Sequence, residues 1–244
     1  MRYKFEVIYI TRFLLGVDLA KNFDFTSLAV IEMATDAKEP VYHLRALDRA
    51  RGVDYPQISE TIIATIKRLQ QESGTTDGPH LCLDASGLGA PIRDYLKQSP
   101  LFRPSPHGYG HVPRSFFPVV FTGGESARYD SITGNYNISK SLIVGNFLSL
   151  MQHRRFDYAP DLQALPLLEE EIAAFKRHTT TSGKNTFDAE AGAHDDLICA
   201  ICIPLIIGEV RYNNKPQRHP VAVPLPRPDQ LLTGRAAQPK VPKF

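Results

Sequence analysis

The first fifty residues contain three short apolar runs rich in β-forming residues, and the pattern changes to helical spacing after them. The runs lie at Phe13–Leu19, Ser27–Met33 and Val41–Leu47, and polar residues, Gly, Pro and Asp separate them. Such runs, divided by short turns, are typical of neighbouring antiparallel strands. We therefore expect a three-stranded antiparallel meander at the start of the fold.

Helices and strands are predicted to alternate beyond the meander. Apolar residues from Ile58 to Leu69 recur at helical spacing, which predicts an amphipathic helix over Tyr55–Glu72. The further elements expected are a strand at His80–Asp84, a helix at Ala90–Leu96, a strand at Ser115–Phe121, and helices at Ile138–His153, Leu162–Arg177 and Asp195 to about Ile207. Pro204 is expected to kink or end the last helix. The pattern predicts an α/β fold with a mixed sheet flanked by helices.

Carboxylates stand where apolar segments meet a turn or a helix start. Asp18 closes the first strand, Asp84 closes the fourth, and the pair Asp195 and Asp196 opens the last helix. Acids so far apart in sequence suggest one pocket, built where strand ends and a late helix converge. Carboxylate oxygens suit hard divalent cations such as Mg²⁺ or Mn²⁺. Each acid taken alone also fits a strand-ending turn or a helix cap.

Composition divides the chain into a body and a basic tail. The chain has 244 residues, 43% of them hydrophobic, which suits one buried α/β domain over residues 1–210. Residues 211–244 hold seven Lys or Arg, one acid and seven prolines, so the tail carries a net charge of +6 and the body about −4. Prolines deny the tail regular hydrogen bonding, and we expect a flexible appendage. A phosphate-contacting arm and a solvated chain end both fit it.

Cysteine content and hydropathy bear on the compartment. Cys82, Cys199 and Cys202 lie in apolar segments and are too few for a disulfide framework, so a reducing, intracellular setting is expected. Cys199 and Cys202 have a spacing also found in metal sites, but buried small hydrophobic residues explain it better inside an apolar helix. No run approaches the ~18 apolar residues of a membrane span, and no clear cleavable leader is seen. We expect a soluble, cytosolic protein that is not secreted.

The order of these elements resembles the ribonuclease H-like fold, in which acids on the first strand, at the end of the fourth strand and on a late helix meet. Local strings narrow the resemblance to the nuclease domain of phage terminase large subunits. The strings, in chain order, are Gly16–Ala20, Leu83–Gly89, Thr122–Glu125, Ile138–Lys140, Leu168–Phe175 and His194–Ala200. Each is weak alone, but their order and spacing together are specific, and the likeness covers roughly residues 14–208.

The resemblance implies a metal-dependent endonuclease that hydrolyses DNA phosphodiester bonds during viral genome packaging. Two Mg²⁺ or Mn²⁺ ions, about 3.5–4 Å apart, serve such an enzyme. The resemblance implies that Asp18 bridges the ions, that Asp84 holds one of them and that Asp196 is the third ligand. Asp195 is then a supporting group or a helix cap. His194 would orient a water or a carboxylate, or belong to the cap region. 

The same resemblance implies partners. Double-stranded DNA would be held through its phosphates without regard to sequence, because nothing in the chain resembles a base-reading helix or a zinc finger. Full-length large terminases carry an ATPase motor, whereas this chain has no Gly-x-x-x-x-Gly-Lys-Ser/Thr loop. We therefore expect no ATP hydrolysis by the chain, which would be a nuclease fragment or a product that works beside a separate motor. A small terminase subunit and a portal are further expected partners, in the cytoplasm of the host cell.

Other interpretations remain open at this stage. A Holliday-junction resolvase or transposase-like nuclease of the same fold would use similar acids, and a non-catalytic DNA-clamping or assembly module would bind no metal. Arg154–Arg155 and Lys176–Arg177 follow helices, where they would complement the helix dipole or contact phosphates. Asp24 is expected to begin a turn, and His107 and His111 are expected in a surface loop rather than at a metal.

Overall fold

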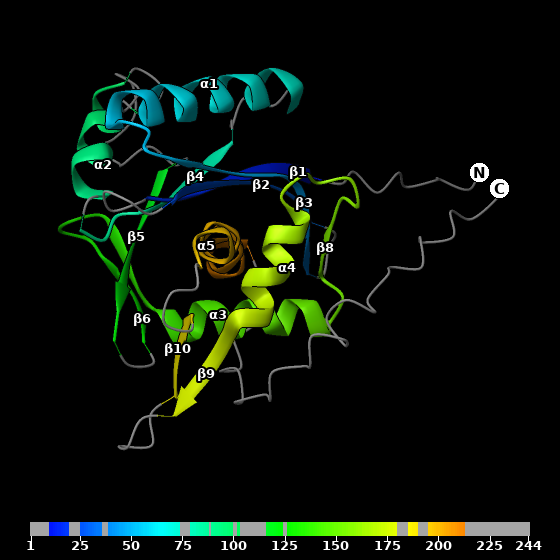
Figure 1. Ribbon diagram of the computed structural model, residues 1–244. Coiled ribbons are helices and arrows are strands. Elements are labelled where there is room, and N and C mark those ends of the chain that lie inside the picture. Colours follow the sequence, from blue (N-terminus) through cyan, green and yellow to red (C-terminus); the bar gives the residue numbers. More distant parts are fainter. Residues whose placement is uncertain are drawn as a thin grey trace, which may run out of the picture.

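An eight-stranded sheet carries the fold, with helices on both of its faces (Figure 1). The computed structural model describes residues 10–19, 25–35, 39–73, 79–87, 89–99, 102, 116–123, 126–179, 185–189 and 195–212. In chain order its elements are β1 (Ile10–Asp18), β2 (Phe25–Thr35), β3 (Pro40–Arg51), α1 (Tyr55–Ser73), β4 (His80–Asp84), α2 (Gly89–Gln98), β5 (Phe116–Thr122), β6 (Ala127–Asp130), β7 (Asn135–Ser139), α3 (Lys140–Gln152), β8 (Phe156–Tyr158), α4 (Leu165–Ala174), β9 (Phe175–Thr179), β10 (Asn185–Ala189) and α5 (Asp196–Tyr212).

The antiparallel meander expected at the start of the chain is confirmed. β1, β2 and β3 pair antiparallel, with Asp18 opposite Ser27 and Ser27 opposite Arg49. β4 joins the other edge of β1 in parallel, and β5 and β7 extend the sheet in parallel beyond it. β6 pairs antiparallel with β7 at one end, and β8 pairs in parallel with β3 at the other. The sheet is thus mixed, as expected, in the order β6-β7-β5-β4-β1-β2-β3-β8.

The sequence prediction missed the five strands β6 to β10. β6, β7 and β8 are short strands near the two edges of the main sheet, and β9 pairs with β10 in a separate two-stranded sheet. The helix expected from Ile138 begins only at Lys140, because residues 135–139 pair with β5 and β6. The Ser139 hydroxyl then accepts the N–H of Leu142, which caps α3. The sequence prediction therefore extended the helix over residues that form the end of a short strand before the helix cap.

The last two helices differ from expectation at their ends. α4 begins at Leu165 and ends at Ala174, and the chain continues as β9 where the sequence predicted helix to Arg177. α5 continues through Pro204 to Tyr212, beyond the expected end near Ile207. A proline inside a helix removes one hydrogen bond, and packing on all sides of α5 holds the helix together across that gap. Residues 213–244, most of the predicted tail, lie outside the described residues.

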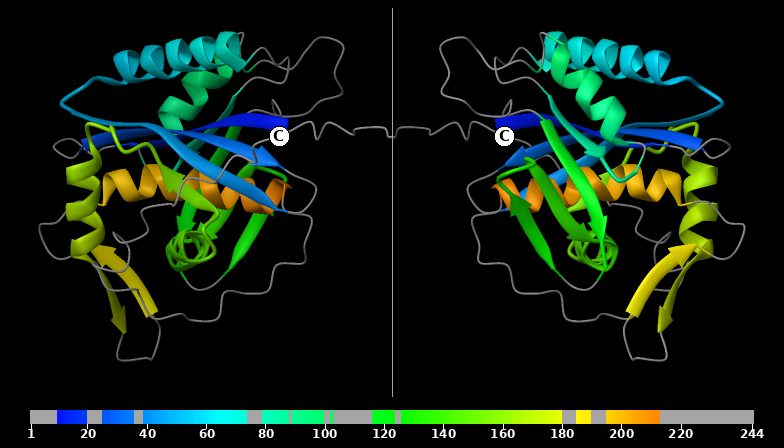
Figure 2. Two further views of the ribbon diagram at one scale, coloured as in Figure 1. Left: turned by 90° about the vertical axis from the view of Figure 1, so that its right-hand side faces the viewer. Right: turned by 90° about the vertical axis from the view of Figure 1, so that its left-hand side faces the viewer.

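Strand alternation separates two apolar layers on the two faces of the sheet (Figures 1 and 2). Leu15 and Val17 of β1 and Leu81 of β4 pack with α1 and α2, for example against Ile62. The residues between them point to the opposite face, where α3, α4 and α5 lie. Because successive side chains of a strand point to opposite faces, Asp18, which follows Val17, faces α5.

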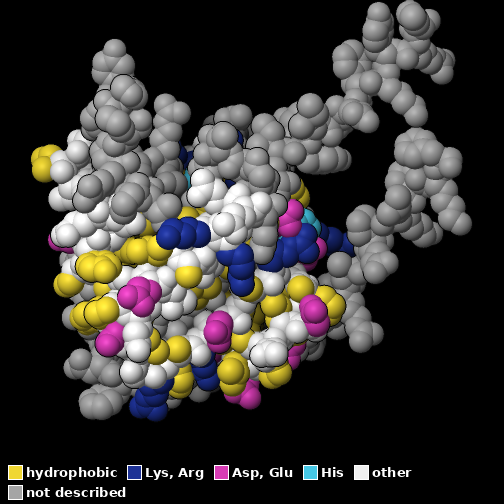
Figure 3. All heavy atoms as spheres, turned by 90° about the horizontal axis from the view of Figure 1, so that it is seen from above, with side chains coloured by type: hydrophobic (Ala, Val, Ile, Leu, Met, Phe, Trp, Pro, Cys, Tyr) yellow, Lys and Arg dark blue, Asp and Glu magenta, His cyan; other side chains and the backbone are white. Residues whose placement is uncertain are grey.

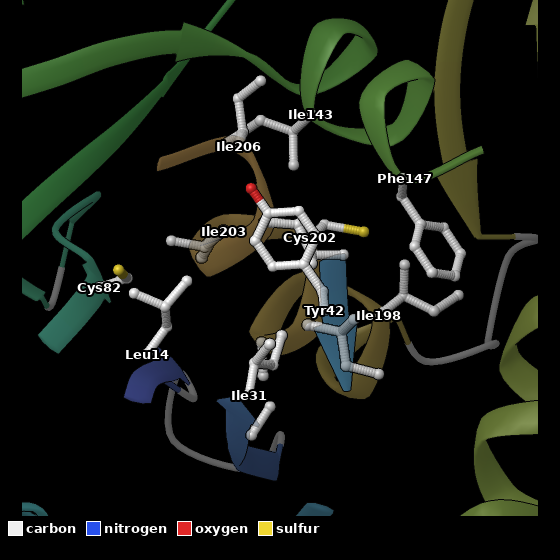
Figure 4. Packing of buried hydrophobic residues seen from close by; sticks show 14 of the residues in the cluster. Leu14, Ile31, Tyr42, Cys82, Ile143, Phe147, Ile198, Cys202, Ile203 and Ile206 are labelled. Carbon is white, nitrogen blue, oxygen red and sulfur yellow. The ribbon is translucent and has the colours of Figure 1, made fainter. Parts of the chain in front are cut away.

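α5 is the central helix of the larger core. Every residue from Leu197 to Glu209 is buried, since the sheet lies on one side of the helix and α3 and α4 lie on others (Figures 1 and 2). Figure 4 shows Ile198, Cys202 and Ile206 of this helix among residues of β1, β2, β3 and α3. A helix that is apolar all round is typical of a fully buried position. Any charged residue on it therefore needs a specific partner.

The outer face of α1 and α2 is mixed in character. Figure 3 views this side and shows Lys, Arg, Asp and Glu side chains interspersed with small apolar areas. None of the helices in the described residues is long and apolar enough to cross a membrane.

Cys82, Cys199 and Cys202 are buried free thiols, and burial raises the pKa of each. The interpretation of Cys199 and Cys202 as small core residues is confirmed.

Candidate metal centre

Two of the four predicted acids lie at neighbouring strand ends. Asp18 and Asp84 are the last residues of β1 and β4, which pair side by side in parallel. Leu14, four residues before Asp18, and Cys82, two residues before Asp84, both belong to the core on the α5 face. Side chains two apart on a strand share a face. Both carboxylates therefore point to the face of the sheet that α5 covers.

The backbone of α5 lies directly on β1 at Gly16. A Cβ atom on Gly16 would stand 1.9 Å from the carbonyl oxygen of Ala200 and 2.7 Å from Cγ and Cδ of Pro204. Pro204 has no N–H to donate to that carbonyl, which lies four residues before it. Only glycine permits such an approach. The contact is two residues from Asp18 and four residues from Asp196, so it fixes the acidic end of the helix over the end of the strand.

The turn after β4 orients the carboxylate of Asp84. Oδ1 of Asp84 accepts the N–H of Ser86 at 2.7 Å, and Oγ of Ser86 accepts the N–H of Phe121 at 3.0 Å. α2 begins against the same residue, because a Cβ on Gly89 would lie 2.0 Å from the backbone oxygen of Asp84. The strand-ending turn considered from the sequence is therefore present at Asp84, and it holds a side chain that is only 9% exposed.

The folded chain brings the four predicted acids together. Burial raises the pKa of Asp18 well above its ordinary value, and the charges of Asp84, Asp196 and Asp195 raise it further, in that order. The ammonium group of Lys140 acts in the opposite direction and lowers the pKa of Asp18. Carboxylates that share a poorly solvated site disfavour each other's ionisation. The carboxylates at the two strand ends and at the start of α5, together the acidic centre, therefore lie close enough for their charges to act on one another.

Asp195 occupies the N-cap position of α5. Its backbone carbonyl accepts the N–H of Cys199 at 2.9 Å, which is the first hydrogen bond of the helix. Its carboxylate pairs with Lys140, with 2.6 Å between Nζ and Oδ2, and both side chains are partly exposed. Lys140 is the first residue of α3 and follows the capping residue Ser139. The loop between β7 and α3 thus supplies a positive charge to the acidic centre.

Asp196 is the first residue of α5 and is partly buried. Its charge raises the pKa of Asp18 and also that of Glu171 on α4. From Leu197 onward α5 is buried on all sides, so orientation along the helix does not separate Asp195 from Asp196 as a ligand. The two acids differ in their effect on Asp18, because the charge of Asp196 raises the pKa of Asp18 more than the charge of Asp195 does.

Sequence reasoning assigned no role to Lys140 or Glu171, which both meet the acidic helix end. Glu171 is 5% exposed, and its Oε2 accepts the backbone N–H groups of Leu197 at 3.0 Å and Ile198 at 3.2 Å. A signal for Glu171 was visible, because it lies three residues after the buried Leu168, on the apolar face of α4. No comparable signal marked Lys140, whose neighbours in sequence are polar and apolar alike.

The metal ligands named from the sequence stay predictions. Among the residues that the structure describes, no group of three or more His, Cys, Asp or Glu side chains is arranged to enclose a metal ion. The carboxylates are gathered at one edge of the sheet without forming a coordination sphere in this arrangement. His194 and Asp24, like His107 and His111, lie outside the described residues.

The fold is similar to those of solved terminase nucleases. The large terminase nuclease of thermophilic phage G20c with bound magnesium matches with a TM-score of 0.50 and 19% identity, over 80% of this chain and 81% of that chain. The large terminase nuclease domain of Thermus phage P74-26 matches with a TM-score of 0.50 and 18% identity, over 84% of each chain. The G20c nuclease with bound cobalt gives 0.50 and 18%, over 80% and 81%. No protein-family model and no curated protein matches the sequence.

The likeness extends over most of the chain and concerns its architecture. In this chain the matched architecture is an eight-stranded mixed sheet with helices on both faces. At 18–19% identity the match establishes the arrangement of the backbone and leaves the activity to be argued from the site. The chain has the ribonuclease H-like fold of terminase large-subunit nuclease domains.

Proposed function

We propose that the chain is a divalent-metal-dependent endonuclease that hydrolyses phosphodiester bonds of DNA during viral genome packaging. The observation that carries the proposal is the convergence of Asp18 and Asp84, at adjacent parallel strand ends, with the acidic start of α5. Gathering buried carboxylates opposes stability, and such arrangements concentrate at sites that perform chemistry. The likeness to terminase nucleases, with bound magnesium in one and bound cobalt in another, supports the same conclusion.

The chemistry of the donor set suits a hard divalent cation. Asp18, Asp84 and Asp196 offer only carboxylate oxygens, which are the ligands that Mg²⁺ and Mn²⁺ prefer. The thiols of Cys199 and Cys202 are soft ligands that are buried in the core, so a hard cation is expected to prefer the carboxylates. Two bound cations would supply activation of the attacking water and stabilisation of the leaving oxygen.

Each acid has a distinct task in the proposed site. Asp18 is assigned to the shared position between the ions, because the charges of all three other acids act on it. Asp84, oriented by the N–H of Ser86, would hold one ion. Asp196 is preferred as the third ligand, because its charge acts more strongly on Asp18 than the charge of Asp195 does. Asp195 would support the ligands through that ion pair.

DNA would be held through its phosphates, independently of sequence. Arg155, one candidate phosphate contact, is not available for this task, because its guanidinium donates to the Glu209 carboxylate and to the carbonyl of Pro40. The side chains of Lys176 and Arg177 lie outside the described residues. A separate ATPase motor, a small terminase subunit and a portal complete the proposed set of partners.

Plasmid cleavage tests the proposal. Wild-type protein with Mn²⁺ or Mg²⁺ is expected to nick or linearise supercoiled DNA, and a chelator is expected to stop the reaction. Asp18→Asn and Asp84→Asn keep the shape of the side chain and remove its charge, so both should lose cleavage. Asp161→Asn changes an exposed acid in the loop before α4 and serves as the matched control, which should cut like wild type. Circular dichroism checks that all variants fold.

Two outcomes would redirect the proposal. Cleavage confined to four-way junctions would favour a resolvase of the same fold. If no divalent cation supports cleavage and titration calorimetry detects no Mn²⁺ uptake, the endonuclease proposal fails and a DNA-clamping module becomes the better account.

A further inference from the structure

Glu171 caps α5 from a different helix. The four leading N–H groups of a helix have no partners within the helix, and a carboxylate placed there is favoured by the helix dipole. Oε2 of Glu171, on α4, accepts two of these groups, from Leu197 and Ile198. Glu171 lies 26 and 27 residues before the two donors in sequence, so the cap depends on the packing of α4 against α5. 

Glu171 takes the N–H groups that the N-cap residue would normally serve. The side chain of an N-cap Asp usually accepts the N–H two or three positions further on. For Asp195 those positions are Leu197 and Ile198, which both donate to Glu171 instead. The Asp195 carboxylate is thereby available to Lys140, 2.6 Å away. Because Glu171 occupies these two N–H groups, the Asp195 carboxylate is directed towards Lys140 instead.

The other oxygen of Glu171 ties the helix end to the sheet. Oε1 accepts from Nη1 of Arg49 at 3.2 Å, and the Arg49 guanidinium lies 4.3 Å from the centre of the Phe25 ring. Arg49 is opposite Ser27, and Ser27 is opposite Asp18, so the three form one row across β3, β2 and β1. The row that carries Asp18 is therefore linked through Arg49 to the first turn of α5.

The position of Glu171 is costly for a carboxylate. Burial raises the pKa of Glu171 to about 7, and the charge of Asp196 adds to the rise, while the two backbone N–H groups and Arg49 act against it. An apolar side chain of similar volume would avoid this cost at a buried position. An acid here therefore points to a task other than packing.

We infer that Glu171 is a positioning residue: by capping α5 in place of Asp195, it holds Asp195 and Asp196 in the orientation that the acidic centre requires. The inference rests on the proposed function, because it assigns Glu171 a part in preparing that site for a divalent cation. It adds a residue that contacts neither the ion nor the DNA. Arg49 assists by anchoring Glu171 to the sheet.

Calorimetric titration with Mn²⁺, in the absence of DNA, tests the role of Glu171. Glu171→Ala is expected to weaken Mn²⁺ binding by about 10–100-fold, the usual loss when a group that orients ligands is removed. Glu171→Gln keeps an oxygen that accepts the N–H groups of Leu197 and Ile198, so it should recover most of the affinity. Glu170→Ala, the exposed neighbour on α4, is the matched control and should bind like wild type.

A purely structural role would give a different result. Phe147→Leu on α3, where the Phe147 ring contacts Phe156 of β8, is expected to lower the melting temperature by loss of core packing. This variant should bind Mn²⁺ like wild type despite its lower stability. If it loses affinity as Glu171→Ala does, or if Glu171→Ala binds Mn²⁺ like wild type, the positioning role is overturned.

A stability cycle without metal gives an independent test. Once Glu171 is replaced by Ala, Asp195 is expected to turn back and cap its own helix. Asp195→Ala should therefore lower the melting temperature of the Glu171→Ala protein by about 2–4 °C more than that of wild type, the loss expected of a helix cap. Equal effects in both backgrounds would contradict the inference. The failures are distinguishable, because lack of Mn²⁺ binding by wild type overturns the proposed function and leaves this cycle unaffected.

Discussion

The two ends of α5 both bury carboxylates, and the surroundings of those carboxylates differ. At the C-terminal end, Glu209 is 6% exposed and is surrounded by donors. The hydroxyl of Tyr42 donates to its Oε1 at 2.7 Å, and Arg155 donates from Nη1 to Oε2 at 3.1 Å and from Nη2 to Oε1 at 2.5 Å. The Arg155 guanidinium thus compensates the charge of Glu209, with Glu39 also 3.7 Å from its Nε, and the helix end is locked to β3 and to the turn after α3.

At the N-terminal end of α5, acidic side chains outnumber the basic side chains that could compensate them. Four aspartates meet there beside Glu171, whereas Lys140 lowers the pKa of Asp18 and Arg49 pairs with Glu171. A buried charge without full compensation opposes folding, and a divalent cation would relieve it. One helix therefore combines a structural carboxylate, satisfied within the protein, with carboxylates whose repulsion favours the binding of a cation from solution.

Removing an acid at the N-terminal end should have the largest effect, and it should act oppositely on activity and stability. Asp18→Asn is expected to lower DNA cleavage by at least about 100-fold, the upper range for loss of a group that merely supports metal ligands. The same change should raise the melting temperature of the metal-free protein at pH 7 by about 2–4 °C, or ~1 kcal/mol. Plasmid cleavage and calorimetry measure the two effects.

The sign of the stability effect follows from the raised pKa of Asp18. Between its ordinary pKa and the raised value, the folded protein binds more protons than the unfolded chain, so stability falls as the pH rises through that window. Asparagine carries no charge and removes this loss. A melting temperature that drops at pH 7 in Asp18→Asn would show that the acids are already compensated, and the contrast between the two helix ends would disappear.

Removing the acid at the C-terminal end should have the opposite outcome. Glu209→Ala leaves the Arg155 guanidinium and the Tyr42 hydroxyl without their shared acceptor, which should cost about 3–5 kcal/mol. The melting temperature should fall by roughly 10 °C or more, while cleavage at 25 °C per folded molecule stays unchanged. Glu209→Gln, which still accepts from Tyr42, should lie between wild type and Glu209→Ala. Stability like that of wild type in Glu209→Ala would mean that this end is not locked as described.

A third test moves α5 without touching any charge. Gly16→Ala places a Cβ against the Ala200 carbonyl, and the overpacking should cost about 1–3 kcal/mol. Because the helix must shift away from β1, Mn²⁺ affinity should fall as well. Gly123→Ala is the control, since a Cβ there meets nothing within 4 Å. Denaturant unfolding and Mn²⁺ titration of both variants are compared. Unchanged Mn²⁺ affinity in Gly16→Ala would show that this contact does not control the geometry of the site.

Lys140 offers a smaller and more local test. Lys140→Met removes a positive charge from the acidic centre, so Mn²⁺ should bind about fivefold more tightly in calorimetry, roughly 1 kcal/mol for a partly exposed charge. The metal-free protein should become slightly less stable for the same reason. Lys67→Met, on the exposed face of α1, controls for the general loss of charge. Weaker Mn²⁺ binding would indicate that Lys140 orients Asp195 more than it repels the ion.

The smallest expected effect lies far from either end of the helix. A hydrogen bond to Asp157 raises the pKa of His43, and the charge of Asp157 contributes to the rise. The contribution to stability is fully present below the unfolded pKa of about 6.5 and is lost as the pH rises through the raised folded value. His43→Asn should therefore lower the melting temperature at pH 5.5 but not at pH 9, by less than about 1 kcal/mol because both side chains are partly exposed.

The parts of the fold that the sequence predicted share one property, which is a strong local pattern. Apolar runs ended by Asp18 and Asp84 marked β1 and β4, and the apolar stretch after Asp196 marked α5. β6 left no such pattern, because most of its residues are exposed at the sheet edge. β9 and β10 were missed because only their mutual pairing defines them.

The residues of the candidate site differ in the same respect: some are marked by a local sequence pattern and others are not. Its acids were predictable because carboxylates that end apolar segments contrast with their neighbours in sequence. Lys140 and Glu171 act on the site through tertiary contacts with Asp195 and with the backbone of α5, and such contacts leave only weak marks on the local pattern. The preference for Asp196 over Asp195 likewise follows from the arrangement of charges around Asp18 rather than from the local sequence pattern.

Transplanting this acidic centre into another protein would require more than its carboxylates. The height of α5 above the sheet is set by Gly16 against the Ala200 carbonyl, next to the ring of Pro204. A scaffold with any larger residue at the position of Gly16 would hold its helix too far from the strand, however well the acids were copied. Designers of artificial phosphodiesterases who borrow this architecture should therefore begin from the glycine and its facing proline, and add the charges last.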